Sequence, residues 1–190
     1  MSPELDKQLC EKYPLIFAQR HMSMQETAMC WGFDIGDGWY NIIDALCANI
    51  QNHINNINRQ IEYKEKMNSV YDGVRTGDLT LFNEYYKSFN PEYRSDILKK
   101  TYSGQIVNFN IPEKERQTQA VQVKEKFGTL RFYIDYGDDS VYAYISMAES
   151  MSARTCETCG KPGKLRGQGW AYTSCNEHAK DGDKDEDEHE

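Results

Sequence analysis

Four residues near the C-terminus have the types and spacing of a metal site. Cys156, Cys159, Cys175 and His178 follow the pattern C-x2-C-x15-C-x2-H. Two close ligand pairs joined by a loop can converge on one tetrahedral ion, and thiolate and imidazole are ligands that zinc prefers. Because four protein ligands fill a tetrahedral shell, the pattern predicts a structural Zn²⁺ rather than a catalytic one. The alternative is four unrelated residues that include a redox-active thiol pair.

The segment around these cysteines needs the metal to fold. Residues 154–180 carry few large apolar side chains and several glycines, so they cannot build a core of their own. Metal ligation then supplies most of the local folding energy. We therefore expect a zinc ribbon-like knob over residues 154–180, which is called the knob below.

A second candidate site follows a predicted strand, where cations alternate with aromatic rings. Cations can bind phosphate and rings can stack on bases, as in sites for nucleotides or single-stranded nucleic acid. The alternative is an ordinary amphipathic strand with solvated charges. An aromatic, glycine-rich turn earlier in the chain has the same ambiguity, because its tryptophans are either core anchors or binding residues. The candidate ligand-binding residues are Lys126, Arg131, Tyr133, Trp31 and Trp39.

Motifs for catalysis are missing from the sequence. There is no glycine-rich phosphate loop, no nucleophile elbow and no metalloprotease helix motif, and the chain has only four histidines. We therefore expect a protein that is not an enzyme. An enzyme that uses a carboxylate near the sheet, such as Glu149 or Asp135, is the alternative.

The elements that must position these residues predict an α+β fold. Apolar residues recur every three or four positions over 39–68, which predicts one long amphipathic helix. Alternating residues over 121–136 predict a hairpin that turns at Gly128, and a further helix is expected over 141–152. The expected fold is a long amphipathic helix and further helices on a small antiparallel sheet, followed by the knob. Residues 1–153 would form the body, with 71–119 as an insertion.

Charge and composition restrict the class of protein. The net charge is −8, and residues 181–190 hold seven acidic side chains and one lysine, so we expect a disordered acidic tail there. No apolar run is long enough to span a membrane, and no secretion signal is evident. Three cysteines outside the metal pattern are isolated, which fits a reducing cytoplasm: Cys10, Cys30 and Cys47.

Motifs in three stretches of the chain resemble those of a family of small proteins of tailed bacteriophages and prophages. Most proteins of that family have no assigned function. The motifs are WGF and GDGW over 31–39, KEKFGTLRFY over 124–133, and CETCGKPG, GW and the final C-x2-H over 156–178. The resemblance implies expression in a bacterial host cytoplasm. It also implies a protein that binds a host factor or sequesters a nucleotide-like defence signal.

Two further expectations concern partners. A nucleic-acid-binding module, in which the knob and the strand grip phosphates, is the alternative to a protein that binds a host factor or a small molecule. The apolar stripe of the long helix also offers a surface for pairing with a second copy of the chain.

Overall fold

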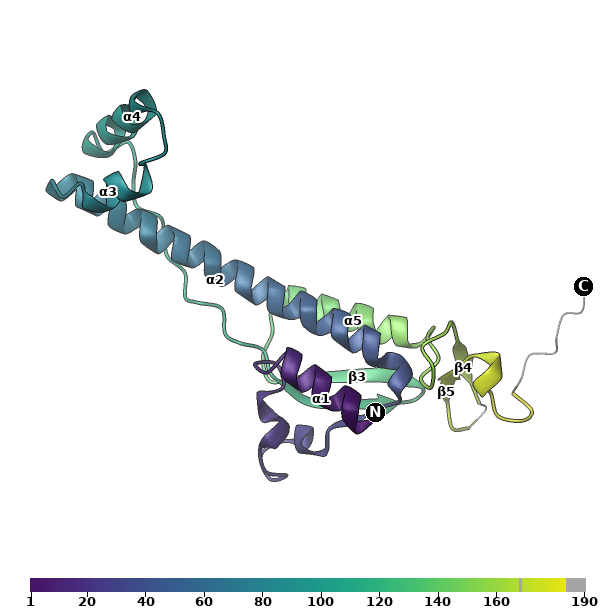
Figure 1. Cartoon of the computed structure of the whole chain (residues 1–190). Coiled ribbons are helices and arrows are strands. Elements are labelled where there is room, and N and C mark those ends of the chain that lie inside the picture. The colour runs from purple at the N-terminus through teal and green to yellow at the C-terminus, as the bar shows by residue number, and fades with distance from the viewer. Residues whose placement is uncertain (168, 184–190) are drawn as a thin grey trace, which may run out of the picture. The chain divides into compact units, whose positions relative to one another are not determined.

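The computed structural model describes residues 1–167 and 169–183 (Figure 1). Most of the acidic tail predicted for 181–190 lies outside the described residues. The fold is α+β, as predicted. The helices are α1 (Pro3–Lys12), α2 (Tyr40–Thr76), α3 (Thr80–Tyr85), α4 (Pro91–Tyr102) and α5 (Asp139–Ser152), with short 3-10 turns at η1 (Ala18–His21), η2 (Ala28–Trp31), η3 (Asp37–Trp39) and η4 (Asn176–His178). The strands are β1 (Phe33–Asp34), β2 (Ala120–Lys126), β3 (Thr129–Ile134), β4 (Lys164–Arg166) and β5 (Tyr172–Ser174).

The chain forms two compact units. The first contains residues 1–54 and the chain from Arg116 onward, and the second contains residues 55–115. The knob therefore belongs to the same unit as the sheet. The second unit begins within α2, at Asn55, whereas the insertion was expected to begin at residue 71. Within the described residues, no helix is long and apolar enough to cross a membrane.

A three-stranded sheet lies at the centre of the first unit, in the order β1-β2-β3. Strands β2 and β3 form the predicted antiparallel hairpin, which turns at Phe127 and Gly128. The sheet is mixed rather than purely antiparallel, because β1 pairs in parallel with β2. Its inner face carries Val123, Leu130 and Phe132, all buried.

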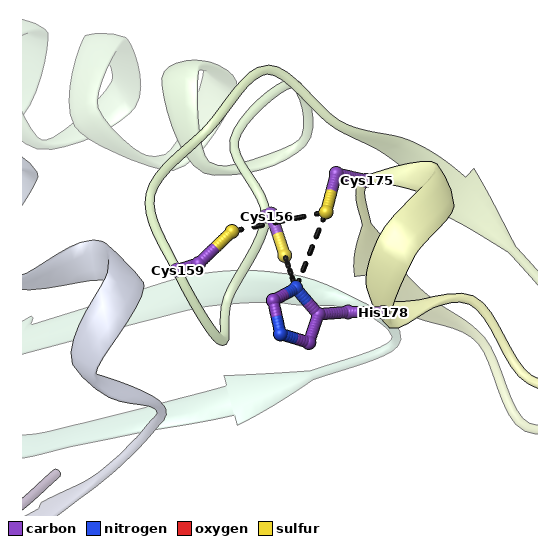
Figure 2. Close-up of side chains that lie close together, drawn as sticks. All are labelled: Cys156, Cys159, Cys175 and His178. Carbon is purple, nitrogen blue, oxygen red and sulfur yellow. Dashed lines mark hydrogen bonds between the residues drawn. The ribbon is translucent and has the colours of Figure 1, made fainter.

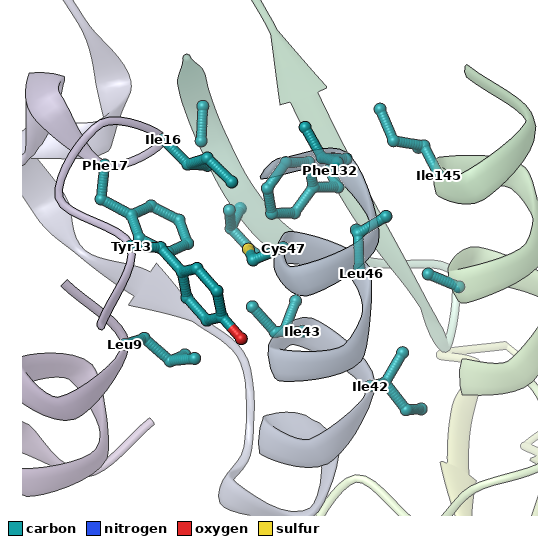
Figure 3. Packing of buried hydrophobic residues seen from close by; sticks show 14 of the residues in the cluster. Leu9, Tyr13, Ile16, Phe17, Ile42, Ile43, Leu46, Cys47, Phe132 and Ile145 are labelled. Carbon is teal, nitrogen blue, oxygen red and sulfur yellow. The ribbon is translucent and has the colours of Figure 1, made fainter. Parts of the chain in front are cut away.

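The core of the first unit forms between this sheet and the helices around it. Figure 3 shows residues of α1 and of the turn after it packed against the N-terminal part of α2, with Phe132 of β3 and Ile145 of α5 on the other side. The rings of Phe17 and Phe132 meet edge to face at 6.4 Å. The apolar stripe of α2 fills this core with Ile42, Ile43, Leu46, Cys47, Ile50 and Ile54.

The free edge of β3 is closed by side chains of α5. The amide of Leu130 donates to Ser152 Oγ at 2.8 Å, and the amide of Phe132 donates to Glu149 Oε1 at 3.2 Å. Ser152 Oγ in turn donates to the Glu149 carbonyl at 2.6 Å. The helix thus satisfies strand donors that would otherwise be open to another strand.

The second unit is built on the later part of α2, which extends to Thr76 rather than ending near Asn68. Its core joins Met67, Val70 and Val74 to Phe82 of α3 and Ile97 of α4. Most of the apolar stripe of α2 is buried within the chain in both units.

Asparagines on the polar side of α2 hold the extended segment that returns from α4. Asn68 exchanges two hydrogen bonds with the backbone of Phe109, at 2.7 and 2.9 Å. Asn58 accepts from the amide of Glu115 at 2.9 Å. These side-chain amides replace the neighbouring strand that an extended backbone would otherwise need.

Candidate metal centre and adjoining surface

The four predicted metal ligands converge at one point of the knob (Figure 2). Their ligand atoms all lie within 4.8 Å of one another. Cys159 Sγ and Cys175 Sγ are 3.7 Å apart, and His178 Nδ1 lies 3.2 Å from Cys175 Sγ and 3.7 Å from Cys156 Sγ. Two sulfurs in a tetrahedron with metal–sulfur bonds of about 2.3 Å are about 3.8 Å apart. The geometry therefore fits one metal ion with four protein ligands.

The first ligand pair lies on a tight turn, Cys156–Gly160, which is called the knuckle below. Gly160 ends it with a φ of +75°, a conformation that favours glycine, and its amide donates to the Cys156 carbonyl at 2.9 Å. Burial raises the pKa of the Cys156 thiol, but amide donors from Cys175, Cys159 and Thr158 outweigh burial and lower the pKa to about 6. The knuckle thus favours the thiolate that a metal requires.

The other ligands complete the site from two elements. Cys175 directly follows β5, and His178 lies one turn later on η4. The amide of Lys161 lowers the pKa of Cys159, but burial and the neighbouring Cys156 and Cys175 sulfurs outweigh it, so the pKa is raised. Without a cation between the sulfurs, a second negative charge is unfavourable there.

The GDGW turn, Gly36–Trp39, contacts the knuckle through hydrogen bonds from its backbone amides to Glu157. The amide of Gly38 donates to the Glu157 carbonyl at 2.7 Å, and the amide of Gly36 donates to Glu157 Oε1 at 2.9 Å. A Cβ on Gly38 would lie 2.2 Å from the Cys156 carbonyl oxygen, which is far inside contact distance. Glycine at position 38 therefore permits a backbone approach that no other residue would allow.

Trp39 is a structural residue of this contact. Its side chain is fully buried, and its indole Nε1 donates to the Thr155 carbonyl at 2.8 Å. Because the ring is fully buried, it has no open face for a ligand. The expected ligand-binding role of Trp39 is therefore wrong. Trp31, by contrast, is 71% exposed at the end of η2.

The turn of the hairpin holds the knob from a second direction. Thr173 Oγ1 on β5 donates to the Gly128 carbonyl at 2.5 Å, and the amide of Glu157 donates to the Thr173 carbonyl at 3.1 Å. A Cβ on Gly128 would lie 2.3 Å from Leu165 Cδ1. The knob is thus joined to the body by close contacts with two glycine-containing turns, GDGW and the hairpin turn at Phe127 and Gly128.

The register of the hairpin brings the other candidate residues to one face. Lys124 lies opposite Arg131, and Gln122 lies opposite Tyr133. We call this set, with Lys126, the hairpin face. Tyr133 is 40% exposed, and Lys124 Nζ lies 5.6 Å from the centre of its ring. Two like charges placed directly opposite each other destabilise a strand pair unless an anion lies between or above them.

The two carboxylates considered for catalysis have structural partners. Glu149 accepts from the Phe132 amide and lies 3.8 Å from Arg131. Asp135 binds Arg116 at 2.6 Å and accepts from the Gln119 amide at 2.8 Å. Both side chains therefore hold the sheet, which weakens the alternative of an enzyme that uses them.

A feature of the hairpin turn was not recognised in the sequence. Phe127 has a φ of +55°, which is costly for a bulky residue, and its ring is 72% exposed. The Phe-Gly pair itself indicates this strain, because a two-residue hairpin turn usually carries Asn-Gly. Trp170 in the knob is likewise exposed, at 83%.

No family model, curated protein or solved structure matches this chain. The site itself defines the class: an α+β protein with a Cys₃His cluster that could bind a metal ion.

Proposed function

We propose that this chain is a non-enzymatic binding protein in which Zn²⁺ is structural and the hairpin face binds an anionic, nucleotide-like ligand. The observation that carries the first part is the closed geometry of Cys156, Cys159, Cys175 and His178. Four protein ligands leave no position for water or substrate on the metal. Three thiolates and an imidazole also favour zinc over magnesium or calcium, which prefer oxygen ligands.

The hairpin face supports the second part. Lys124 and Arg131 lie opposite each other beside the ring of Tyr133, and Lys126 continues the same face toward the turn. Arg131 also lies 3.8 Å from Glu149, and phosphate oxygens would add charge-assisted hydrogen bonds from the lysines beside it, while the ring offers a stacking surface. A nucleotide supplies both groups in one small molecule.

The resemblance to phage proteins suggests a biological role for this binding. A phage protein that binds a nucleotide without turning it over would sequester a signal made by the infected bacterium. Glu149 and Asp135 each accept a hydrogen bond from a backbone amide of the sheet, which favours a structural role for both carboxylates over a catalytic one. Sequestration also requires that the ligand be recovered unchanged after release from the purified protein.

Calorimetric titration of the zinc-bound protein tests the ligand class. The probes are ATP, GTP, their 3′,5′-cyclic monophosphates and cyclic di-GMP, and we expect at least one to bind. The double variant Lys126→Gln/Arg131→Gln should weaken that binding by about tenfold or more, since charge-assisted hydrogen bonds contribute about 1.5–3 kcal/mol each. Lys99→Gln, which removes an exposed cation of the second unit, is the matched control.

Nucleic acid is the competing ligand, because it presents the same phosphates. If it is the true partner, an oligonucleotide should bind when free nucleotides do not. Its affinity should also fall steeply as salt rises. Binding of neither probe would remove the nucleotide proposal and leave the structural metal site unaffected.

A further inference from the structure

The turn of the β2–β3 hairpin and the loop before β5 enclose a hollow of about 360 Å³. Its walls are Glu125, Lys126, Phe127, Gly169, Trp170 and Ala171. The two aromatic rings are among the most exposed in the chain, with 72% of Phe127 and 83% of Trp170 open to solvent. Small-ligand sites in proteins begin at about this volume, which suits a single planar ring system.

Phe127 occupies its position at a cost. Its φ of +55° precedes that of Gly128 at +78°, so both central residues of the turn have the backbone signs of a turn that favours Asn-Gly. The exposed ring recovers little of this cost by burial in the free protein. A strained, exposed aromatic residue beside a hollow points to a contact made with something else.

The charges around the hollow indicate the chemistry of that contact. Lys126 Nζ lies 5.3 Å from the centre of the Phe127 ring, and Lys126 also belongs to the hairpin face. The hollow therefore opens beside the strands that carry Lys124 and Arg131. Rings next to Lys124, Lys126 and Arg131, the last of which lies 3.8 Å from Glu149, match a base with its phosphate.

We propose that this hollow holds the base of a free nucleotide against Phe127 and Trp170, while its phosphate lies on the hairpin face. This inference rests on the proposed function and adds the part of the site that reads the base. One wall of the hollow comes from the hairpin, and the other comes from the part of the knob between Cys159 and Cys175. The metal ligands thereby fix the segment that carries Trp170.

Calorimetric titration of the zinc-bound full chain with ATP, GTP and their cyclic monophosphates tests the proposal. The variants are Trp170→Ala and Phe127→Asn, the second of which keeps the turn conformation because asparagine accepts a positive φ. We expect each to weaken binding by about tenfold, within the range found when a stacking ring is removed from a base. Tyr142→Ala, which removes an exposed ring of α5, should bind as the unaltered protein does.

The outcomes separate this inference from the function on which it rests. If both ring variants bind normally while Lys126→Gln/Arg131→Gln does not, the base site is overturned and the phosphate face stands. If the unaltered protein binds none of the nucleotides, both proposals fail. If oligothymidylate binds and no free nucleotide does, the free nucleotide is the wrong ligand.

Discussion

Gly38 decides how closely the GDGW turn approaches the knuckle. Its amide donates to the Glu157 carbonyl at 2.7 Å, and the space where a side chain would begin is taken by the Cys156 carbonyl and the Gly160 amide. The contact joins a turn near the N-terminus to the first ligand pair. Because glycine has no Cβ at position 38, the backbone of the GDGW turn can approach the backbone of the knuckle.

We expect Gly38→Ala to destabilise the protein by about 2–3 kcal/mol, because the new methyl group overpacks a contact between two backbones. The free energy of unfolding in denaturant measures the effect. Gly169→Ala is the matched control, since a Cβ there would meet nothing within 4 Å. Equal stability of the two variants would contradict the importance of the contact.

Phe127→Asn should have the opposite effect on stability. Asparagine tolerates the left-handed conformation that costs phenylalanine energy, and the exposed ring contributes little burial. We expect a gain of about 1 kcal/mol in the free energy of unfolding. A loss of stability would mean that the Phe127 ring packs usefully in the free protein, and the case for a ligand contact would weaken.

The convergence of Cys156, Cys159, Cys175 and His178 was predictable at the residue scale, because their spacing and residue types are those of a metal site. The sequence could not show that Trp39 is buried, since GDGW predicts a tight turn without naming what packs on it. The partner of the turn lies 121 residues away at Glu157, and only the folded chain brings the two together. The strain at Phe127 was readable in principle from its place before Gly128.

At the scale of elements, α5 completes the sheet through its side chains. Ser152 and Glu149 accept from amides of β3 that point away from β2. Ser152 is fully buried, so its hydroxyl has no water to replace these bonds. The helix thereby protects an edge that would otherwise be able to pair with another strand.

Ser152→Ala leaves the Leu130 amide buried without an acceptor, so we expect a loss of about 1–3 kcal/mol in the free energy of unfolding. Ser146→Ala, on the exposed side of the same helix, should change stability by less than about 0.5 kcal/mol. Amide hydrogen exchange should also become faster at Leu130. Unchanged exchange there would show that the bond to Ser152 is dispensable.

Periodicity predicted the elements well where the chain is regular. The hairpin turning at Gly128 and the helix that ends at Ser152 lie where the pattern placed them, and the long helix begins as expected but continues past Asn68 to Thr76. The parallel pairing of β1 was not predictable, because two residues form too short a strand to give a pattern. Nor did the pattern reveal that Asn58 and Asn68 hold a returning segment, since polar side chains on a helix usually face water.

At the scale of the whole molecule, the Cys/His cluster belongs to the same compact unit as the sheet. The knob contacts the GDGW turn, the hairpin turn and the end of α5, so its folding is shared with the first unit. A self-contained zinc module would have fewer backbone bonds to its neighbours. Loss of the metal should consequently disturb residues far from the four ligands.

Metal analysis of the purified protein should give one zinc per chain, and Cys159→Ser should reduce that content. Chelation should lower the melting temperature by about 10 °C or more, since each kcal/mol shifts Tm by about 2–4 °C at this size. Tryptophan emission should shift to the red as Trp39 becomes exposed, because Trp31 and Trp170 are already open to solvent. Ser146→Ala provides a control that keeps the ligands.

The separation between the GDGW turn and its partner also sets the order of events on the ribosome. Glu157 is synthesised 121 residues after Gly36, which takes about 6–24 s at about 5–20 residues per second. During that interval Trp39 lacks the carbonyl that its indole binds in the finished fold. The first unit therefore closes only after the knuckle has been synthesised, and chains that stop before the knuckle keep an unsatisfied turn.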